Sequence, residues 1–240
     1  MKGIILAGGK ATRLRPLTKI TSKQLLPVYN KPMIFYPIET LIKAGIKDIL
    51  IIIAPDYAGQ FLNLLGSGKD FGARFSYEIQ DEPRGLADAF IIGKNFIGKD
   101  NVTMILGDNI FIGHDFSAQI KAFESGAMIF SKQVPDPERY GVAEFDDKMN
   151  VISLEEKPAK PKSNYAVVGL YTYDNQVINF AQNLKPSERG EIEITDINKI
   201  YLEKKQLKVN IIDGVWEDAG TFDSLLRIQN IVAEKVKSEG

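Results

Sequence analysis

The feature that most restricts the fold is a regular alternation of short apolar segments with helical patterns over the first 110 residues. Short apolar, β-branched segments predict buried strands, and apolar residues three and four positions apart predict helices. The expected strands are 2–7, 48–54, 75–79 and 101–106, and the expected helices are 36–44, 56–65 and 86–96. Strands that alternate with helices run mostly parallel, in a sheet covered by helices on both faces. We therefore expect a three-layer, Rossmann-like α/β fold with a mostly parallel mixed sheet and a ligand site beyond the carboxyl ends of its strands.

The second half of the chain has a different pattern. Short apolar segments at 127–131, 141–145 and 151–154, with a hairpin turn expected at 146–150, predict an inserted antiparallel ribbon. Further strands are expected at 166–171 and 207–212, and helices at 174–184, 191–204 and 222 to about 235. The inward faces expected for the last two helices are Ile194, Ile197 and Tyr201 in one, and Leu225, Leu226, Ile228 and Val232 in the other. Because no linker or repeat separates the halves, we expect one domain over residues 1–240.

Composition excludes several classes of protein. Without cysteine there is no disulfide, thiolate nucleophile or sulfur-ligated metal, and the single histidine, His114, is expected in a turn and not in a Ser-His-Asp hydrolase site. Any bound metal must then have oxygen ligands. The longest apolar run, 49–54, is far shorter than the ~18 residues of a membrane helix, and the N-terminal segment lacks the features of a signal peptide. We therefore expect a cytoplasmic protein with no membrane partner.

Charge is distributed unevenly along the chain. The first 38 residues contain seven Lys or Arg and no Asp or Glu, which leaves 23 basic and 31 acidic side chains in the rest. A basic segment on an acidic body predicts a local site for a small anion, whereas a nucleic-acid-binding protein has a broad basic face. Gly8 and Gly9 follow the first expected strand, and glycines there let backbone N–H groups approach phosphate. The phosphate motifs G-x-G-x-x-G and G-x-x-x-x-G-K-[ST] are both absent, and a solvated basic loop is the alternative interpretation.

A series of motifs resembles the sugar-1-phosphate nucleotidylyltransferases. The first is Leu6-Ala-Gly-Gly-Lys-Ala-Thr-Arg-Leu14, followed by Lys23-Gln-Leu-Leu-Pro27. Further blocks are Leu106-Gly-Asp-Asn109, Asp136-Pro-Glu-Arg-Tyr-Gly-Val142, Leu154-Glu-Glu-Lys-Pro158, Asn164-Tyr-Ala-Val-Val-Gly-Leu-Tyr171, Arg189-Gly-Glu-Ile-Glu-Ile-Thr-Asp196 and Trp216-Glu-Asp-Ala-Gly-Thr221. The blocks follow the family's order, and they are most similar to the branch that joins a thymidylyl group to glucose-1-phosphate.

The resemblance implies a reaction and its substrates. In this family an oxygen of a sugar-1-phosphate attacks the α-phosphorus of a nucleoside triphosphate, and the products are a nucleotide-sugar and pyrophosphate. For this chain the resemblance implies the nucleotidyltransferase fold, dTTP and glucose-1-phosphate as substrates, Mg²⁺ as cofactor, no nucleic acid, and a homo-oligomer. It also implies a nucleotide-binding part at about 1–110, a sugar-phosphate-binding part at about 111–221 and a C-terminal helix at 222–236.

The same resemblance implies the site residues, through the matching motif positions. Asp108 and Asp218 would bind Mg²⁺, for which carboxylates are suitable hard ligands. Arg13 would stabilise the leaving pyrophosphate, and Lys23 would lie near the α-phosphate. The remaining positions would contact the substrates: Gly8 and Gly9 the phosphates, Gln24, Gln80 and Gly85 the nucleoside, Asn109, Gly141, Glu156 and Val167 the hexose, and Lys157 and Arg189 the sugar phosphate.

Two alternatives stay open from the sequence: a uridylyltransferase acting on the same sugar phosphate, and a non-catalytic sensor of nucleotides or sugar phosphates. The chain also departs from the family pattern. Ala11 stands where the family usually has glycine, and the chain ends at Gly240, whereas family members commonly continue into a segment that helps form subunit contacts and a regulatory nucleotide site. We therefore expect the end product dTDP-rhamnose to inhibit only by competing with dTTP.

Overall fold

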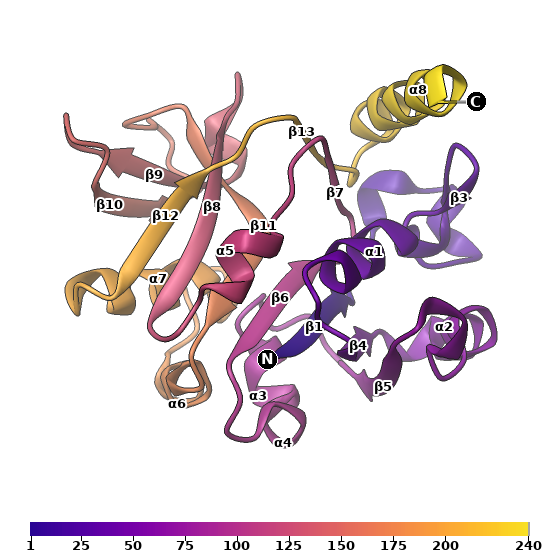
Figure 1. Ribbon diagram of the computed structural model, residues 1–240, viewed down its shortest axis with the longest axis horizontal. Coiled ribbons are helices and arrows are strands. Elements are labelled where there is room, and N and C mark those ends of the chain that lie inside the picture. Colours follow the sequence, from indigo (N-terminus) through magenta and orange to yellow (C-terminus); the bar gives the residue numbers. More distant parts are fainter. Residues whose placement is uncertain (240) are drawn as a thin grey trace.

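The computed structural model describes residues 1–239, and within them nine strands form one mixed sheet (Figure 1). The order along the sheet is β10-β9-β11-β6-β1-β4-β5, and β8 pairs with β11 and with β12. The parallel half of the sheet consists of β1 (Lys2–Ala7), β4 (Asp48–Ile53), β5 (Arg74–Ile79) and β6 (Val102–Leu106). The expected α/β fold class is confirmed.

β11 (Tyr165–Tyr173) joins the two halves of the sheet, because it pairs antiparallel with β6, β8 and β9. The other strands of this half are β8 (Ala127–Gln133), β9 (Gly141–Phe145), β10 (Val151–Glu156) and β12 (Leu207–Ile211). The expected antiparallel ribbon is the β9–β10 hairpin, whose turn is closed by Asp146: its carboxylate accepts the N–H groups of Lys148 and Asn150 at 2.9 and 2.8 Å. β8 lies apart from this hairpin, between β11 and the parallel strand β12.

The two faces of the sheet belong to separate hydrophobic cores. Ile5 and Ala7 of β1 enter one core, and Ile4 and Leu6 enter the other, because successive side chains of a strand point to opposite faces. The first core is covered by α1 (Phe35–Lys43), α2 (Ala58–Leu65) and α5 (Ser117–Lys121). The second is covered by α3 (Asp88–Ile92), α4 (Lys94–Ile97), α6 (Gln176–Asn183) and α7 (Ile194–Glu203). Helices on both faces bury the central strands β1, β4 and β6, whereas the edge strand β5 stays partly exposed.

Two glycines determine where helices end in the parallel half. α1 ends because Gly45 takes a φ of +87°, and the N–H of Gly45 donates to the Ile42 carbonyl at 2.9 Å. The single helix predicted at 86–96 is wrong, since α3 ends and α4 begins at Gly93. A Cβ on Gly93 would lie 3.0 Å from the Ile4 side chain, so the glycine lets this segment approach β1 closely.

A third core lies under the last helix, α8 (Phe222–Glu239), beside the short hairpin of β2 (Pro27–Val28) and β3 (Lys31–Pro32) (Figure 1). Leu225, Ile228 and Val232 are buried there as expected. The prediction for Leu226 is wrong: its side chain is 58% exposed, because it follows Leu225 directly and lies about 100° further round the helix. No helix within residues 1–239 is both long and apolar enough to cross a membrane.

Candidate active site

The candidate site lies at the carboxyl ends of the central parallel strands. β1 has β4 on one side and β6 on the other, so the order of strands along the chain reverses at this point. In α/β sheets the crevice outside such a switch point is the usual ligand site. Gly8 and Gly9 follow β1, Gly107 and Asp108 follow β6, and the N–H of Gly107 donates to the Leu6 carbonyl at 2.9 Å.

The basic segment after β1 folds through 3₁₀ turns that bring Lys23 to Asp108. The Lys23 ammonium donates a charge-assisted hydrogen bond to the Asp108 carboxylate. Burial alone would lower the pKa of Lys23, but the carboxylates of Asp108 and Asp218 outweigh it and raise the pKa above its usual 10.5. Burial would likewise raise the pKa of Asp108, but the charge and hydrogen bond of Lys23 hold it below 3.8. Both groups are therefore charged at neutral pH.

Asp218 reaches the same place from a distant part of the chain. β7 (Asn109–Ile112) pairs antiparallel with β13 (Val215–Asp218), which puts Asp218 opposite Asn109 and next to Asp108. The Oδ1 atom of Asp218 is buried and has no hydrogen-bond partner in the described part of the chain. Burial, and after it the charge of Asp108, raises the pKa of Asp218 to about 6.

Gly220 lies between Arg13 and Asp218. A Cβ on this glycine would lie 2.8 Å from Asp218 Oδ1 and 2.9 Å from the Arg13 guanidinium. The Arg13 guanidinium and the Asp218 carboxylate therefore both border the small space beside Gly220. Any side chain at position 220 would displace one of them.

Ala11, on the turn that carries Arg13, has a backbone conformation that favours glycine. Its φ of 44° and ψ of 41° are left-handed, and its carbonyl accepts the Thr18 hydroxyl at 2.7 Å and the Leu14 N–H at 3.2 Å. For an L-residue this conformation costs about 1–2 kcal/mol. Ala11, in place of the family's usual glycine, thus keeps the turn intact but strains its backbone.

The pair Asp108 and Asp218 suits a divalent metal ion. Carboxylates are hard oxygen ligands, and the buried, unpartnered Oδ1 of Asp218 beside the ionised Asp108 is a concentration of negative charge that a cation would relieve. Among residues 1–239 no group of three or more His, Cys, Asp or Glu side chains is arranged to hold a metal. Water and substrate phosphates would then complete the coordination, which is the usual arrangement for Mg²⁺.

These charged groups line two adjoining cavities. The first, which we call the nucleotide-side cavity, has a volume of about 190 Å³ and brings together residues predicted for the nucleotide and Mg²⁺: Gly8, Gly9, Lys23, Gln24, Gln80, Gly85 and Asp108. Gly85 has a φ of +103°, and a Cβ there would lie 2.5 Å from the Ile192 carbonyl oxygen, so a side chain at this position would collide with the backbone.

The second cavity, the sugar-side cavity, has a volume of about 310 Å³. It brings together Arg13, Asn109, Gly141, Glu156, Lys157, Val167 and Asp218. Leu86 and Leu106 line both cavities, so the two spaces adjoin. Glu156 accepts the Thr195 hydroxyl at 2.5 Å, and the missing side chain of Gly141 leaves room for both groups.

Asn109, on the wall of the sugar-side cavity, has a fixed orientation. Its Oδ1 accepts the Trp216 indole N–H at 2.7 Å and the Gly169 N–H at 2.9 Å, so its Nδ2 faces Asp108 and donates to that carboxylate at 3.1 Å. The residue predicted to line the hexose is therefore also a support for Asp108.

Arg189 lies at the rim and does not line either cavity in the described chain. It is 43% exposed, and its guanidinium lies 3.7 Å from Glu156, 3.1 Å from Glu191 and 3.4 Å from Glu193. Its ion pair with Glu156 links it to the sugar-side cavity. To reach a phosphate there, the Arg189 side chain would have to turn from the rim into the cavity.

Several residues of these cavities were not singled out from the sequence. Thr195 and Arg139 line the sugar-side cavity, and buried Asp88 supports Gln80 beside the nucleotide-side cavity. Asp88 had a detectable signal, since it is the one acidic residue in the apolar segment 86–96. Thr195 and Arg139 also had a signal, since both lie within the motif blocks that resemble the family, although no role was predicted for either.

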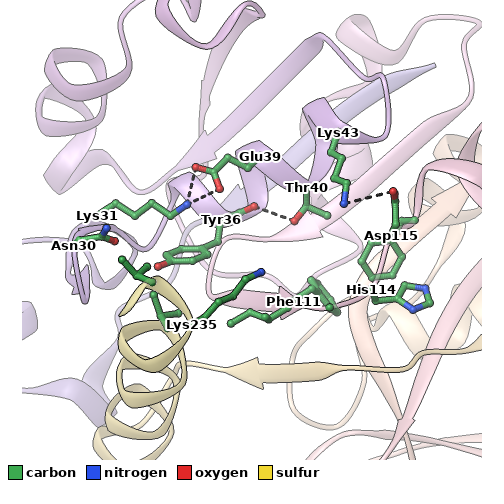
Figure 2. A pocket seen from close by; sticks show the side chains of 15 residues that line it. Asn30, Lys31, Tyr36, Glu39, Thr40, Lys43, Phe111, His114, Asp115 and Lys235 are labelled. Carbon is green, nitrogen blue, oxygen red and sulfur yellow. Dashed lines mark hydrogen bonds and ion pairs between the residues drawn. The ribbon is translucent and has the colours of Figure 1, made fainter. Parts of the chain in front are cut away.

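A third cavity, of about 360 Å³, lies between α1, the far end of β7 and α8 (Figure 2). Lys31 is paired with Glu39 and lies over the Tyr36 ring, and Lys43 lies 3.4 Å from Asp115. His114 lines this cavity from the segment between β7 and α5, with its ring 4.6 Å from that of Phe116. No residue predicted for catalysis, metal or substrate binding lines the described wall of this cavity.

A mixed α/β sheet with two adjoining cavities lined by carboxylates and cations suits the transfer of a group between two bound substrates, as in a nucleotidyltransferase. The chain belongs to the nucleotidyl transferase family, whose model matches residues 2–235. It is 55% identical over 230 residues to a glucose-1-phosphate thymidylyltransferase of Neisseria meningitidis, covering 94% of this chain and 80% of that protein. It is 52% identical over 244 residues to the enzyme of the same name from Mycobacterium tuberculosis, covering 100% and 85%.

Solved structures give the same result. A Bacillus anthracis crystal structure in complex with a sucrose, provisionally assigned as a glucose-1-phosphate thymidylyltransferase, superposes with a TM-score of 0.92 at 46% identity over 96% of this chain and 94% of that one. A UDP-glucose pyrophosphorylase complexed with UDP-glucose superposes with a TM-score of 0.84 at 26% identity over 98% of each chain.

Proposed function

We propose that this protein transfers the thymidylyl group of dTTP to glucose-1-phosphate, forming dTDP-glucose and pyrophosphate with Mg²⁺ as cofactor. The observation that carries the proposal is that the paired Asp108 and Lys23 line the nucleotide-side cavity, while Asp218, next to Asp108, lines the adjoining sugar-side cavity. A group transferred between two substrates has to react at such a junction. Relatives that are 52–56% identical over nearly the whole chain carry the name glucose-1-phosphate thymidylyltransferase, which supports the choice of substrates.

The reaction needs no covalent bond between the substrates and the protein. An oxygen of glucose-1-phosphate forms a new bond to the α-phosphorus of dTTP, the bond from that phosphorus to the bridging oxygen of the β-phosphate breaks, and pyrophosphate leaves with the electron pair. Catalysis can then rest on positioning and on stabilisation of developing negative charge. Lys23 is assigned to the α-phosphate, and Arg13 to the charge that grows on pyrophosphate as it departs.

Asp108 and Asp218 are assigned as the metal ligands. Bound Mg²⁺ would supply Lewis-acid stabilisation of the negative charge on the phosphates. The Lys23 ammonium keeps Asp108 ionised, and the Asn109 amide fixes its orientation, so this carboxylate is ready to bind a cation. The Oδ1 atom of Asp218, which has no hydrogen-bond partner among residues 1–239, supports the assignment of this residue as the second ligand.

The two cavities are assigned to the two substrates. Gln80 and the backbone of Gly85 read the base, Gly8 and Gly9 approach the phosphates, and Gln24 faces the nucleoside. Asn109, Gly141, Glu156 and Val167 surround the hexose, whose hydroxyls need donors and acceptors at fixed positions. Lys157 and Arg189 hold the sugar phosphate, and Arg189 has to leave its carboxylate partners to do so. UTP differs from dTTP by the 5-methyl group on the base, as well as by its ribose 2′-hydroxyl, and it is the second candidate donor.

Release of pyrophosphate tests the proposal directly. The purified protein is mixed with each of several triphosphates and sugar-1-phosphates, with Mg²⁺ or with EDTA, and pyrophosphate is quantified. The expected result is rapid, Mg²⁺-dependent release with dTTP and glucose-1-phosphate together and none with either alone. Tight binding of both compounds without pyrophosphate release would instead favour the sensor, and preference for GTP with mannose-1-phosphate would refute the choice of substrates.

A further inference from the structure

Asp88 is a fully buried carboxylate that takes no part in the proposed chemistry. It lies in the first turn of α3, with its side chain 0% exposed. Two groups surround it: Gln80 Nε2 donates to its Oδ2 at 3.0 Å, and the Arg84 guanidinium donates to its Oδ1 at 2.8 Å. A buried carboxylate is costly unless it is paired in this way, so the arrangement calls for an explanation.

The chemistry of the carboxylate determines which way the Gln80 amide points. An ionised carboxylate can only accept hydrogen bonds, and the Arg84 guanidinium, which can only donate, already holds the other carboxylate oxygen. The amide nitrogen of Gln80 must therefore face Asp88, and its carbonyl oxygen Oε1 must face the opposite way. That oxygen lies at Gly8, only 2.6 Å from where a Cβ on this glycine would be, on the wall of the nucleotide-side cavity.

We infer that Asp88 is a positioning residue that helps to select the base of the donor nucleotide. It holds the Gln80 side chain so that the amide oxygen, a hydrogen-bond acceptor, faces the base. The inference rests on the proposed role of Gln80 in facing the base. Thymine and uracil carry a donor, N3–H, which an acceptor recognises. Cytosine has an unprotonated N3 and would place acceptor against acceptor, leaving both unsatisfied in a buried space.

The variant Asp88→Asn tests this logic because Arg84 stays in place. Arg84 is donor-only, so the new amide turns its oxygen toward Arg84 and its nitrogen toward Gln80. Gln80 must then turn its own oxygen toward position 88 and present its NH₂ group to the base. We expect the affinity for dTTP to fall and that for dCTP to rise, so that their ratio shifts by at least about tenfold.

The primary measurement is equilibrium binding of dTTP and dCTP in the presence of Mg²⁺, by titration calorimetry on the full chain. Equal losses of affinity for dTTP and dCTP in Asp88→Asn would reduce Asp88 to a structural role, and an unchanged ratio would overturn the inference. Asp88→Ser is a second variant in case Asp88→Asn does not fold, since the hydroxyl can donate or accept and should bring the two affinities together. A wild-type preference for dTTP retained in Asp88→Ser would likewise overturn the inference.

Arg84→Ala is the matched control. It leaves the carboxylate to hold Gln80, and Arg84 is 58% exposed, so the preference for dTTP should persist. In the double variant Arg84→Ala with Asp88→Asn, the new amide can face Gln80 with either atom, and the ratio should lie between those of wild type and Asp88→Asn. An equal shift in Arg84→Ala and Asp88→Asn would contradict the mechanism. Pyrophosphate release by the wild-type protein reports separately on the proposed function, because binding selectivity does not require turnover.

Discussion

Replacing Asp218 by asparagine should make the metal-free protein more stable while it removes the activity. In the folded protein, burial and the charge of Asp108 raise the pKa of Asp218 from 3.8 to about 6, and its Oδ1 has no partner within residues 1–239. The folded state therefore binds this proton more tightly than the unfolded chain does. As the pH rises from about 4 through 6, the folded protein loses stability that it has at lower pH.

The size of the effect follows from the shift in pKa. A change from 3.8 to about 6 corresponds to about 3 kcal/mol above pH 6, at ~1.4 kcal/mol for each pKa unit. The neutral amide of Asp218→Asn carries no such penalty. For a chain of this length, about 2–3 kcal/mol corresponds to an increase in Tm of roughly 5–10 °C. The gain should be largest at pH 7.5 and should disappear near pH 4.

The assay is thermal unfolding in EDTA at pH 7.5 and pH 4, together with pyrophosphate release in Mg²⁺. Turnover of Asp218→Asn should fall at least about a hundredfold, because an amide does not offset the charge of Mg²⁺. Asp108→Asn is a control with the opposite expected effect on stability. It should be as inactive as Asp218→Asn but less stable than the wild type, since it leaves the Lys23 ammonium without its closest carboxylate. A metal-free Asp218→Asn protein that is less stable than wild type at pH 7.5 would refute the electrostatic reasoning, and near-normal turnover would remove Asp218 from the metal site.

Three further predictions concern the loop and the base. Arg13→Ala should lower kcat more than it raises KM, because the charge it offsets grows as pyrophosphate departs; Arg15→Ala is the matched control, and an effect confined to KM would assign Arg13 to ground-state binding. Ala11→Gly should raise the free energy of unfolding by roughly 0.5–1 kcal/mol in thermal or urea unfolding, since relief of the left-handed strain exceeds the entropy that glycine adds to the unfolded chain; a loss of stability would show that the turn is not strained. In competition assays dTTP should be used best, UTP appreciably and GTP little, because one methyl group is worth only ~1–3 kcal/mol whereas the larger, two-ring guanine would clash at Gln80; efficient use of GTP would contradict this.

The parallel half of the fold could be predicted because each strand carries its own signal. β1 and β4 are continuous apolar segments bounded by Gly8 and Pro55, and strands buried on both faces have that pattern. β7 and β13 were missed, because each has four residues and their pairing depends on contacts between distant parts of the chain. Gly93 was read as part of a helix, since its close approach to β1 is a property of the tertiary structure.

The candidate site was predictable as a set of positions but not as a network of contacts. The motifs nominated Asp108, Asp218 and Lys23, and the structure brings them together, while their roles stay predictions. No local pattern indicated that Lys23 would pair with Asp108, from which it is separated by 85 positions. The orientation of Gln80 was equally hidden, because it is set by Asp88 and not by Gln80 itself.

The pairing of β7 with β13 also bears on how the protein folds and unfolds. It joins segments whose contact between Asn109 and Trp216 closes a loop of 107 positions, and contacts of such long range carry a large entropic cost to form. We therefore expect the carboxylates of Asp108 and Asp218 to come together late in folding, after the local contacts within each half of the sheet have formed. A ligand that binds both carboxylates therefore finds its site only in the native protein and not in the earlier folding ensemble. We expect such a ligand to slow unfolding without accelerating folding.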